Sequence, residues 1–265
     1  MEKKYILVTG ASGGMGRTTV GMLRGQGYNV IALDISACEA EDGIIPVHAD
    51  IADEASVAAA YEKVVQITDR LHAIIHFAGV YMLDSLVEMS TSDFDRIVDI
   101  NLRGAFLMNK TFLPLLGEGS RIVITTSELA PLDPLPFTGI YAVTKGALDK
   151  YAYSLRMELQ LLGISVSVLR AGAVDTGMLG VSTDALDRFT DKTKLYSCNA
   201  VRFKNIVESV EARSISTEKL AQKMCRIVNA SHPRFSYAIN RNPLLLMLNL
   251  LPKRLQLWAI KQVLK

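Results

Sequence analysis

Two short motifs carry residues whose types and spacing suit redox chemistry on an alcohol. The run Tyr141-Ala-Val-Thr-Lys145 places a phenol and an ammonium four residues apart, so on a helix both side chains point along one face. The run Thr9-Gly10-Ala-Ser-Gly13-Gly14-Met-Gly16 is a glycine-rich turn directly after an apolar stretch, where α/β sheets hold a dinucleotide. A phenol, a nearby lysine and a bound nicotinamide suffice for the reversible oxidation of an alcohol.

Each motif alone has an ordinary structural explanation. A Tyr/Lys pair at this spacing is commonly an exposed pair on a helix surface, and a glycine-rich turn is commonly a tight connection between a strand and a helix. The spacing G-x-x-x-G-x-G also differs from the G-x-G-x-x-G fingerprint, so only the mechanism transfers. Glycines accept positive φ angles and let backbone N–H groups approach a pyrophosphate.

Asp34 favours NAD over NADP as the cofactor. It ends the apolar run 30–33 and lies eighteen residues beyond Gly16, where a carboxylate can accept hydrogen bonds from the adenosine ribose. A carboxylate here repels a 2′-phosphate, and neither Gly13 nor Ile35 supplies a compensating cation. The alternative is an aspartate that only caps the following turn.

Short apolar runs alternate with longer amphipathic segments along almost the whole chain. Runs such as Ile-Leu-Val at 6–8 do not alternate with polar residues, which is typical of strands covered on both faces. Strand–helix–strand units of this length imply right-handed crossovers and a parallel sheet. Strands are expected at 5–9, 29–33, 44–48, 73–77, 121–126, 164–170 and about 235–239, and helices begin near Met15, Glu54, Thr91, Ile140 and Glu218.

The expected fold class is α/β, with one domain over residues 1–265: a Rossmann-like, doubly wound parallel sheet of about seven strands with helices on both faces. Asp50 follows the third strand and could contact the adenine amine or N-cap the helix containing 52–65.

Composition excludes several classes of protein. Of the 265 residues, 49% are hydrophobic and 21% charged, which is ordinary for a soluble globular chain. A net charge of +2 without a long basic run gives no electrostatic case for nucleic acid. Cys38, Cys198 and Cys225 fit neither a metal-binding spacing nor a disulfide framework, so no metal site is expected and a cytoplasmic location is favoured.

The order of these and further residues resembles the short-chain dehydrogenase/reductase family over about residues 4–240. The residues that carry the resemblance are the glycine turn, Asp34, Asp50-Ile51, Phe77-Ala-Gly79, Asn101, Ser127, Tyr141-x-x-x-Lys145 and Gly172-x-x-x-Thr176. The family implies a single doubly wound domain of seven parallel strands, with NAD(P) across the carboxyl ends of the strands. It implies cofactor contacts at Gly10, Ser12, Gly14, Met15, Gly16, Asp34, Ile35, Asp50, Ile51, Ala78, Gly79, Tyr141, Lys145, Gly172, Val174 and Thr176.

The same resemblance implies four catalytic residues. Tyr141 is the acid/base, and we expect Lys145 and the positive nicotinamide ring to lower its pKa from the ordinary value near ~10. Lys145 also binds the nicotinamide ribose. Ser127 steadies charge on the substrate oxygen. Asn101 matches the family asparagine that bends a helix and holds a water in a proton relay.

Three positions depart from the family pattern. Ser127 lies fourteen residues before Tyr141, where members commonly show one fewer, and Thr126 is the alternative because Glu128 has no hydroxyl to donate. The usual Asn-Asn-Ala-Gly is His76-Phe-Ala-Gly here, and His76 is interpreted as a structural histidine. The usual Pro-Gly is Ala-Gly at 171–172.

The substrate side is expected to be apolar. Residues 177–216 occupy the family's substrate lid, and loop 128–140, stiffened by three prolines, forms the opposite wall. The lid residues that could line a pocket, or simply pack the lid onto the body, are Met178, Leu179, Phe189, Tyr196 and Phe203. The loop has no Arg or Lys for a carboxylate or phosphate, which favours a lipophilic alcohol or ketone, hydroxysteroid- or retinoid-like.

The apolar C-terminal segment 242–265 is predicted to form two amphipathic helices broken at Pro252. Its most apolar run, 243–252, is ten residues long, about half the ~20 residues that a membrane-spanning helix needs. Similar segments occur in family members that act on lipids. We expect it to cover the substrate mouth or a subunit interface, and the alternative is contact with a membrane surface through Lys253, Arg254, Trp258, Lys261 and Lys265.

The sequence therefore predicts an NAD-dependent oxidoreductase that transfers a hydride between the cofactor and a small-molecule lipophilic secondary alcohol or ketone, as a homodimer or homotetramer. Two alternatives stay open: a 3-oxoacyl thioester reductase and a non-enzymatic dinucleotide-sensing protein. Because a sensor does not need all of Asn101, Ser127, Tyr141 and Lys145, their presence weighs against it.

Overall fold

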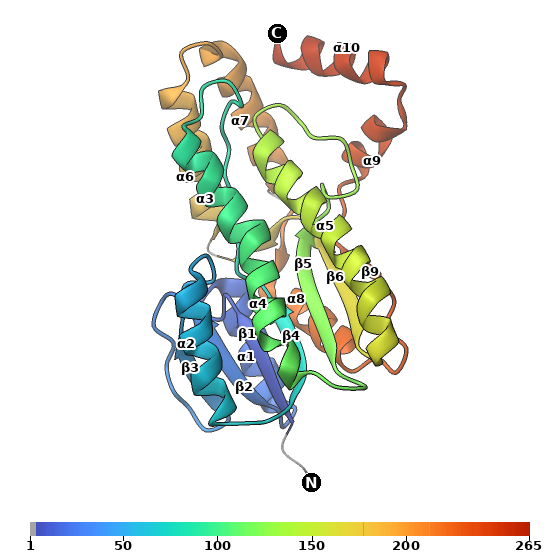
Figure 1. Ribbon diagram of the computed structural model, residues 1–265. Coiled ribbons are helices and arrows are strands. Elements are labelled where there is room, and N and C mark those ends of the chain that lie inside the picture. Colours follow the sequence, from blue (N-terminus) through green and yellow to red (C-terminus); the bar gives the residue numbers. More distant parts are fainter. Residues whose placement is uncertain (1–3, 177, 212) are drawn as a thin grey trace.

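The computed structural model describes residues 4–176, 178–211 and 213–265, and its centre is a seven-stranded sheet in the order β3-β2-β1-β4-β5-β6-β9 (Figure 1). Every neighbouring pair in this sheet is parallel. The strands are β1 (Tyr5–Thr9), β2 (Asn29–Asp34), β3 (Ile44–His48), β4 (Leu71–His76), β5 (Arg121–Ser127), β6 (Ser165–Ala171) and β9 (Ser236–Ile239). The predicted doubly wound α/β fold is confirmed, with strand ends within two residues of the prediction.

Helices cover both faces of the sheet, as Figure 1 shows. The helices α2 (Glu54–Val65), α4 (Gly104–Phe112) and α5 (Gly139–Leu159) pack on one face. The helices α1 (Gly14–Gly25) and α8 (Thr217–Val228) pack on the other. The helix α3 (Thr91–Val98) continues into α4 through a π-helical turn, Asp99–Arg103. Short 3-10 turns at Leu113–Leu115 and Gln160–Leu162 close α4 and α5.

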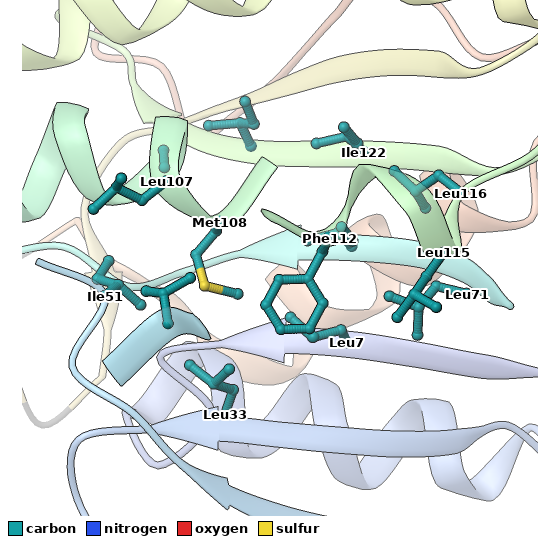
Figure 2. Packing of buried hydrophobic residues seen from close by; sticks show 14 of the residues in the cluster. Leu7, Leu33, Ile51, Leu71, Leu107, Met108, Phe112, Leu115, Leu116 and Ile122 are labelled. Carbon is teal, nitrogen blue, oxygen red and sulfur yellow. The ribbon is translucent and has the colours of Figure 1, made fainter. Parts of the chain in front are cut away.

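The strands are apolar without alternation because both of their faces are buried. In β1 the side chains of Ile6, Leu7 and Val8 are fully buried, and successive residues point to opposite faces. Leu7 belongs to the cluster under α4, whereas Ile6 and Val8 belong to the cluster under α1 and α8. Figure 2 shows the first of these clusters, to which α4 contributes Met108 and Phe112.

Two helix starts are fixed by side-chain caps. The Asp53 carboxylate accepts a hydrogen bond from Ala55 N at 3.1 Å and begins α2, and the Ser90 hydroxyl accepts from Asp93 N at 3.1 Å and begins α3. The alternative that Asp50 N-caps α2 is therefore wrong. The Asp50 carboxylate instead accepts from Ala52 N at 2.9 Å in the turn before the helix.

The upper part of the molecule is built from segments that the sequence pattern did not resolve into elements. Residues of the expected lid form α6 (Met178–Lys192) and α7 (Ser197–Glu211), flanked by a two-stranded parallel sheet of β7 (Val174–Asp175) and β8 (Ile215–Ser216). Two further helices, α9 (Pro243–Leu250) and α10 (Lys253–Leu264), confirm the predicted break at Pro252. Among the described residues, no helix is both long and apolar enough to cross a membrane.

The chain reverses its direction of winding between β1 and β4. From β1 it adds β2 and β3 on one side, and then β4, β5, β6 and β9 on the other. The loops that leave β1 and β4 therefore diverge and open a crevice at the carboxyl ends of these strands. This is the place where open α/β sheets bind their ligands.

Candidate active site

Two cavities meet at the carboxyl edge of the sheet. The first has a volume of about 250 Å³ and lies at the ends of β1, β2 and β4. The second has a volume of about 900 Å³ and lies between the sheet edge, the lid helices and the C-terminal helices. Both are lined by Met15, Phe77, Gly79 and Val80, so they are adjacent.

The structure brings the sequence-predicted cofactor residues to these two cavities. The first is lined by Gly10, Ser12, Gly14, Met15, Gly16, Asp34, Ile35, Asp50, Ile51, Ala78 and Gly79. The second is lined by Tyr141, Lys145, Gly172, Val174 and Thr176. The prediction missed Gly13, Leu33, Ala49, Phe77, Val80 and Ile100 of the first cavity. Each of these residues is next in the sequence to a predicted site residue. Adjacency to a predicted residue is therefore the sequence signal that could have identified them.

The glycine turn leaves bare backbone beside the first cavity. Gly10 has a φ of +69°, and a Cβ atom on it would lie 2.5 Å from Ala78 N. A Cβ on Gly14 would lie 2.4 Å from Thr176 O, and one on Gly16 would lie 2.0 Å from Gly10 O. Side chains are thus excluded at the N-terminus of α1, where backbone N–H groups and the helix dipole attract phosphate. These residues fit the pyrophosphate of a dinucleotide.

Asp34, the last residue of β2, lines the first cavity. One carboxylate oxygen accepts a hydrogen bond from Ser12 N at 3.0 Å, and the other accepts from Ser36 N at 2.9 Å. The second bond is the turn cap that the sequence left as an alternative. The first ties the acid to the glycine turn, and the residue still lines the cavity. Because the carboxylate is held from two sides, its negative charge has a fixed position.

Asn101 sits in the π-helical turn between α3 and α4, where the helix departs from its regular winding. The side-chain oxygen accepts from Val80 N at 2.8 Å, and the side-chain nitrogen donates to Val80 O at 3.0 Å and to Thr144 Oγ1 at 3.2 Å. The segment after β4 and the helix α5 are therefore tied to the same carboxamide. The neighbour of Thr144 on α5 is Lys145.

Ser127 and Tyr141 face each other across the base of the second cavity. The Ser127 hydroxyl hydrogen-bonds to Tyr141 and accepts from Leu129 N at 3.2 Å. The alternative donor, Thr126, instead lies 3.5 Å from Asp149, whose carboxylate forms an ion pair with Arg170 at 2.7 Å. The geometry thus favours Ser127 as the hydroxyl nearest to the phenol.

The pKa of Tyr141 was expected to be lowered by Lys145 and the nicotinamide ring together, and without the cofactor it is raised instead. Burial raises the pKa of Tyr141 to about 12, and the hydrogen bond from Ser127 only partly opposes this. The Lys145 ammonium lies 5.8 Å from the Tyr141 ring centroid and donates to Thr125 O at 3.3 Å. Burial also lowers the pKa of Lys145 to about 8. The sequence could not show this, because desolvation depends on how the helix packs.

His76 is a structural residue, as interpreted from the sequence. Its Nε2 lies 2.9 Å from Asn109 Oδ1 and its Nδ1 lies 3.5 Å from Thr9 Oγ1. Burial lowers the pKa of His76 to about 4, so the ring is neutral at pH 7.

The lid and loop 128–140 form walls of the second cavity, as expected. Phe189 and Phe203 line it and also pack against Phe137, with ring centroids 4.6 and 5.4 Å apart. Tyr196 packs on the same ring at 5.3 Å and is not part of the lining. The side chains of Met178 and Leu179 lie outside the described residues.

Comparison with known proteins gives the following matches. The model of the short chain dehydrogenase family matches residues 4–187. The 3-ketodihydrosphingosine reductase of Bacteroides thetaiotaomicron is 26% identical over 236 residues, which cover 89% of this chain and 87% of that protein. The NADPH-dependent 1-acyldihydroxyacetone phosphate reductase of Schizosaccharomyces pombe is 28% identical over 193 residues, 69% of this chain and 65% of that protein.

A solved short chain dehydrogenase family protein from Francisella tularensis superposes with a TM-score of 0.75. The match covers 90% of this chain and 97% of that chain at 18% identity, so it supports the fold alone.

Replacing the buried lysine tests the electrostatics of the site. Since burial lowers the pKa of Lys145 to about 8, its charged form destabilises the fold, and we expect Lys145→Met to raise the free energy of unfolding at pH 7 by about 1–3 kcal/mol. Between pH 8 and about 10.4 the unfolded chain binds the extra proton, so wild-type stability rises and the difference shrinks. Urea denaturation at pH 7 and pH 10 measures both effects. A less stable variant with a pH-independent difference contradicts the assignment.

Proposed function

This chain belongs to the short chain dehydrogenase family, and we propose that it reduces a ketone on a lipophilic molecule to a secondary alcohol with a nicotinamide cofactor. The second cavity carries this proposal. Its volume of about 900 Å³ is large enough for the nicotinamide end of the cofactor and a bulky substrate together, and Ser127 and Tyr141 lie in its lining. The apolar residues around it include Leu129, Leu135, Phe189, Phe203, Leu245, Leu248, Ile260 and Val263. The names of the two relatives describe reductases of 3-ketodihydrosphingosine and 1-acyldihydroxyacetone phosphate, which agrees with a lipophilic ketone.

The protonation states in the site suit reduction. A phenol with a pKa near 12 keeps its proton at pH 7, so Tyr141 can donate it to the oxygen of the forming alcohol. The Ser127 hydroxyl donates a hydrogen bond to the same oxygen and stabilises its developing charge. Lys145 has a pKa of about 8 and is largely charged at pH 7, so it stabilises the phenolate that Tyr141 becomes. The cofactor, when bound, supplies the hydride.

The first cavity would hold the rest of the cofactor. The backbone at Gly10, Gly14 and Gly16 would bind the pyrophosphate, and Asp34 would accept hydrogen bonds from the adenosine ribose. The fixed carboxylate supports a preference for NAD(H), because a 2′-phosphate beside it is repelled. One relative is named as NADPH-dependent, so the preference has to be measured on this chain.

A series of methyl ketones from 2-butanone to 2-dodecanone tests the lipophilic pocket. Because each methylene that leaves water contributes up to about 0.8 kcal/mol, we expect kcat/KM to rise about two- to fourfold per added carbon until the cavity is full. Oxidation of NADH and NADPH is followed by absorbance, with acetoacetyl thioester as the comparison substrate. A flat series with preference for the thioester favours the 3-oxoacyl alternative. Cofactor binding without turnover of any substrate favours the dinucleotide sensor.

Removing one oxygen tests the proton donor. We expect Tyr141→Phe to lower kcat more than a hundredfold, since the ring still packs against Tyr81, 4.8 Å away, and only the transferable proton is lost. Cofactor affinity, measured by titration calorimetry, should stay within about threefold of wild type. The comparison variant Tyr81→Phe removes a neighbouring phenol and should retain most of the turnover. If Tyr141→Phe keeps more than about a tenth of wild-type kcat, the assigned role is wrong.

Neutralising Asp34 tests the cofactor preference. Asp34→Asn keeps the size and one acceptor oxygen but removes the charge, so the ratio of kcat/KM with NADH to that with NADPH should fall about tenfold or more. Asp50→Asn is the matched control, because Asp50 lines the same cavity and is not assigned to the 2′ position. An unchanged ratio, or a wild type that already prefers NADPH, refutes the proposal.

A further inference from the structure

Helix α10, labelled near the C-terminus in Figure 1, is held at both ends and contributes residues to the lining of the second cavity. At its start, Lys253 forms an ion pair with Asp133, and Gln256 donates to the same carboxylate at 3.1 Å. At its end, Leu264 O accepts hydrogen bonds from Asn199 at 2.6 Å and from Arg202 at 3.4 Å on α7. The helix therefore has a defined orientation relative to the cavity.

One face of α10 belongs to the cavity. Ala259, Ile260, Val263 and Leu264 line it, and their spacing of one, three and one places them along one side of the helix. Leu264 also packs against the buried cluster of Leu83, Ala185, Leu186 and Phe203. Ala259, Ile260 and Leu264 are partly buried on this side, whereas Val263 lines the cavity and is still 58% exposed.

A second face of α10 is exposed and carries two large apolar side chains together with three cations. Arg254, Leu257, Trp258, Lys261 and Lys265 follow one another at helical spacings of three, one, three and four residues, and all are exposed; we call them the outer face. Leu257 is 66% exposed and Trp258 is 61% exposed. Just before the helix, Leu250 is 84% exposed and Leu251 is 40% exposed. A large apolar surface at the rim of a cavity, bordered by polar residues, marks an interaction site.

The charges indicate what covers this face. Residues 242–265 contain four cations, Lys253, Arg254, Lys261 and Lys265, and no aspartate or glutamate. Lys253 is paired with Asp133, and the other three lie on the outer face. A tryptophan and leucines flanked by lysine and arginine are the composition of helices that lie in a membrane interface. We propose that the outer face of α10 rests on the surface of an anionic bilayer, which places the cavity rim against the lipid.

A second copy of the chain fits this face less well. In a two-fold dimer the same patch meets itself, so three cations on each side face three like charges with no acidic residue of the segment to offset them. Lysine is also depleted in protein interfaces, whereas lysine and arginine are enriched where a helix meets anionic headgroups. The proposal concerns where the protein lies and does not depend on the reaction it performs.

Trp258 is the only tryptophan of the chain, so its fluorescence reports on this face alone. With the full chain, we expect vesicles of phosphatidylcholine and phosphatidylglycerol (3:1) to shift its emission to shorter wavelength and to co-sediment the protein. Binding should weaken with rising salt and on pure phosphatidylcholine, because the attraction is electrostatic. Leu257→Asp/Lys261→Glu keeps the tryptophan and should bind at least tenfold more weakly.

The matched control is Leu161→Asp/Lys150→Glu, which makes the same chemical changes at exposed positions outside the segment and should bind like wild type. The proposal is overturned if wild type neither shifts its emission nor co-sediments, or if the two double variants bind equally. It is also overturned if the emission shifts with protein concentration in the absence of lipid while light scattering shows a doubled mass, since a second copy then covers the face. Circular dichroism confirms that each variant is folded, and kinetic measurements are not needed for any outcome.

Discussion

The side chain of Asn101 ties together the segments that form the site. Its side-chain oxygen accepts a hydrogen bond from Val80 N, just beyond β4. Its side-chain nitrogen donates to Val80 O and to Thr144 Oγ1 on α5. Val80 lines both cavities, and Thr144 is followed by Lys145. Asn101 lies in the π turn Asp99–Arg103, where the winding departs from that of a regular α-helix. One buried amide therefore links the segment beside the first cavity to the helix that carries Tyr141.

Much of the fold was predictable because its signals are local. The predicted bounds of β1 and β3 agree with the observed ones. The helices α2 and α3 begin as predicted, directly after the capping residues Asp53 and Ser90. The lid was placed in the sequence, but its division into α6 and α7 was not predicted. Neither was the pairing of β7 with β8, which joins residues about forty positions apart through two hydrogen-bonded pairs. Such pairing depends on tertiary packing and leaves little pattern in a two-residue strand.

For the site, residue types and their order were predictable, whereas energies and long-range bonds were not. The chain order placed Ser127, Tyr141 and Lys145 together, but the raised pKa of the phenol follows from its burial in the folded protein. The sequence shows only that Glu128 cannot be the hydroxyl donor. Its buried carboxylate accepts from Asn242 N at 2.6 Å and so fixes the start of α9, and burial raises its pKa. A bond across more than a hundred residues has no sequence signal.

Loop 128–140 both borders the second cavity and contacts the two C-terminal helices. Glu128 next to Ser127 holds the beginning of α9, and Asp133 in the same loop holds the beginning of α10. The loop that precedes Tyr141 thus also contacts the starts of both C-terminal helices. The helix α10 is apolar toward the cavity, and on its outer face it exposes Leu257 and Trp258 together with the three cations Arg254, Lys261 and Lys265.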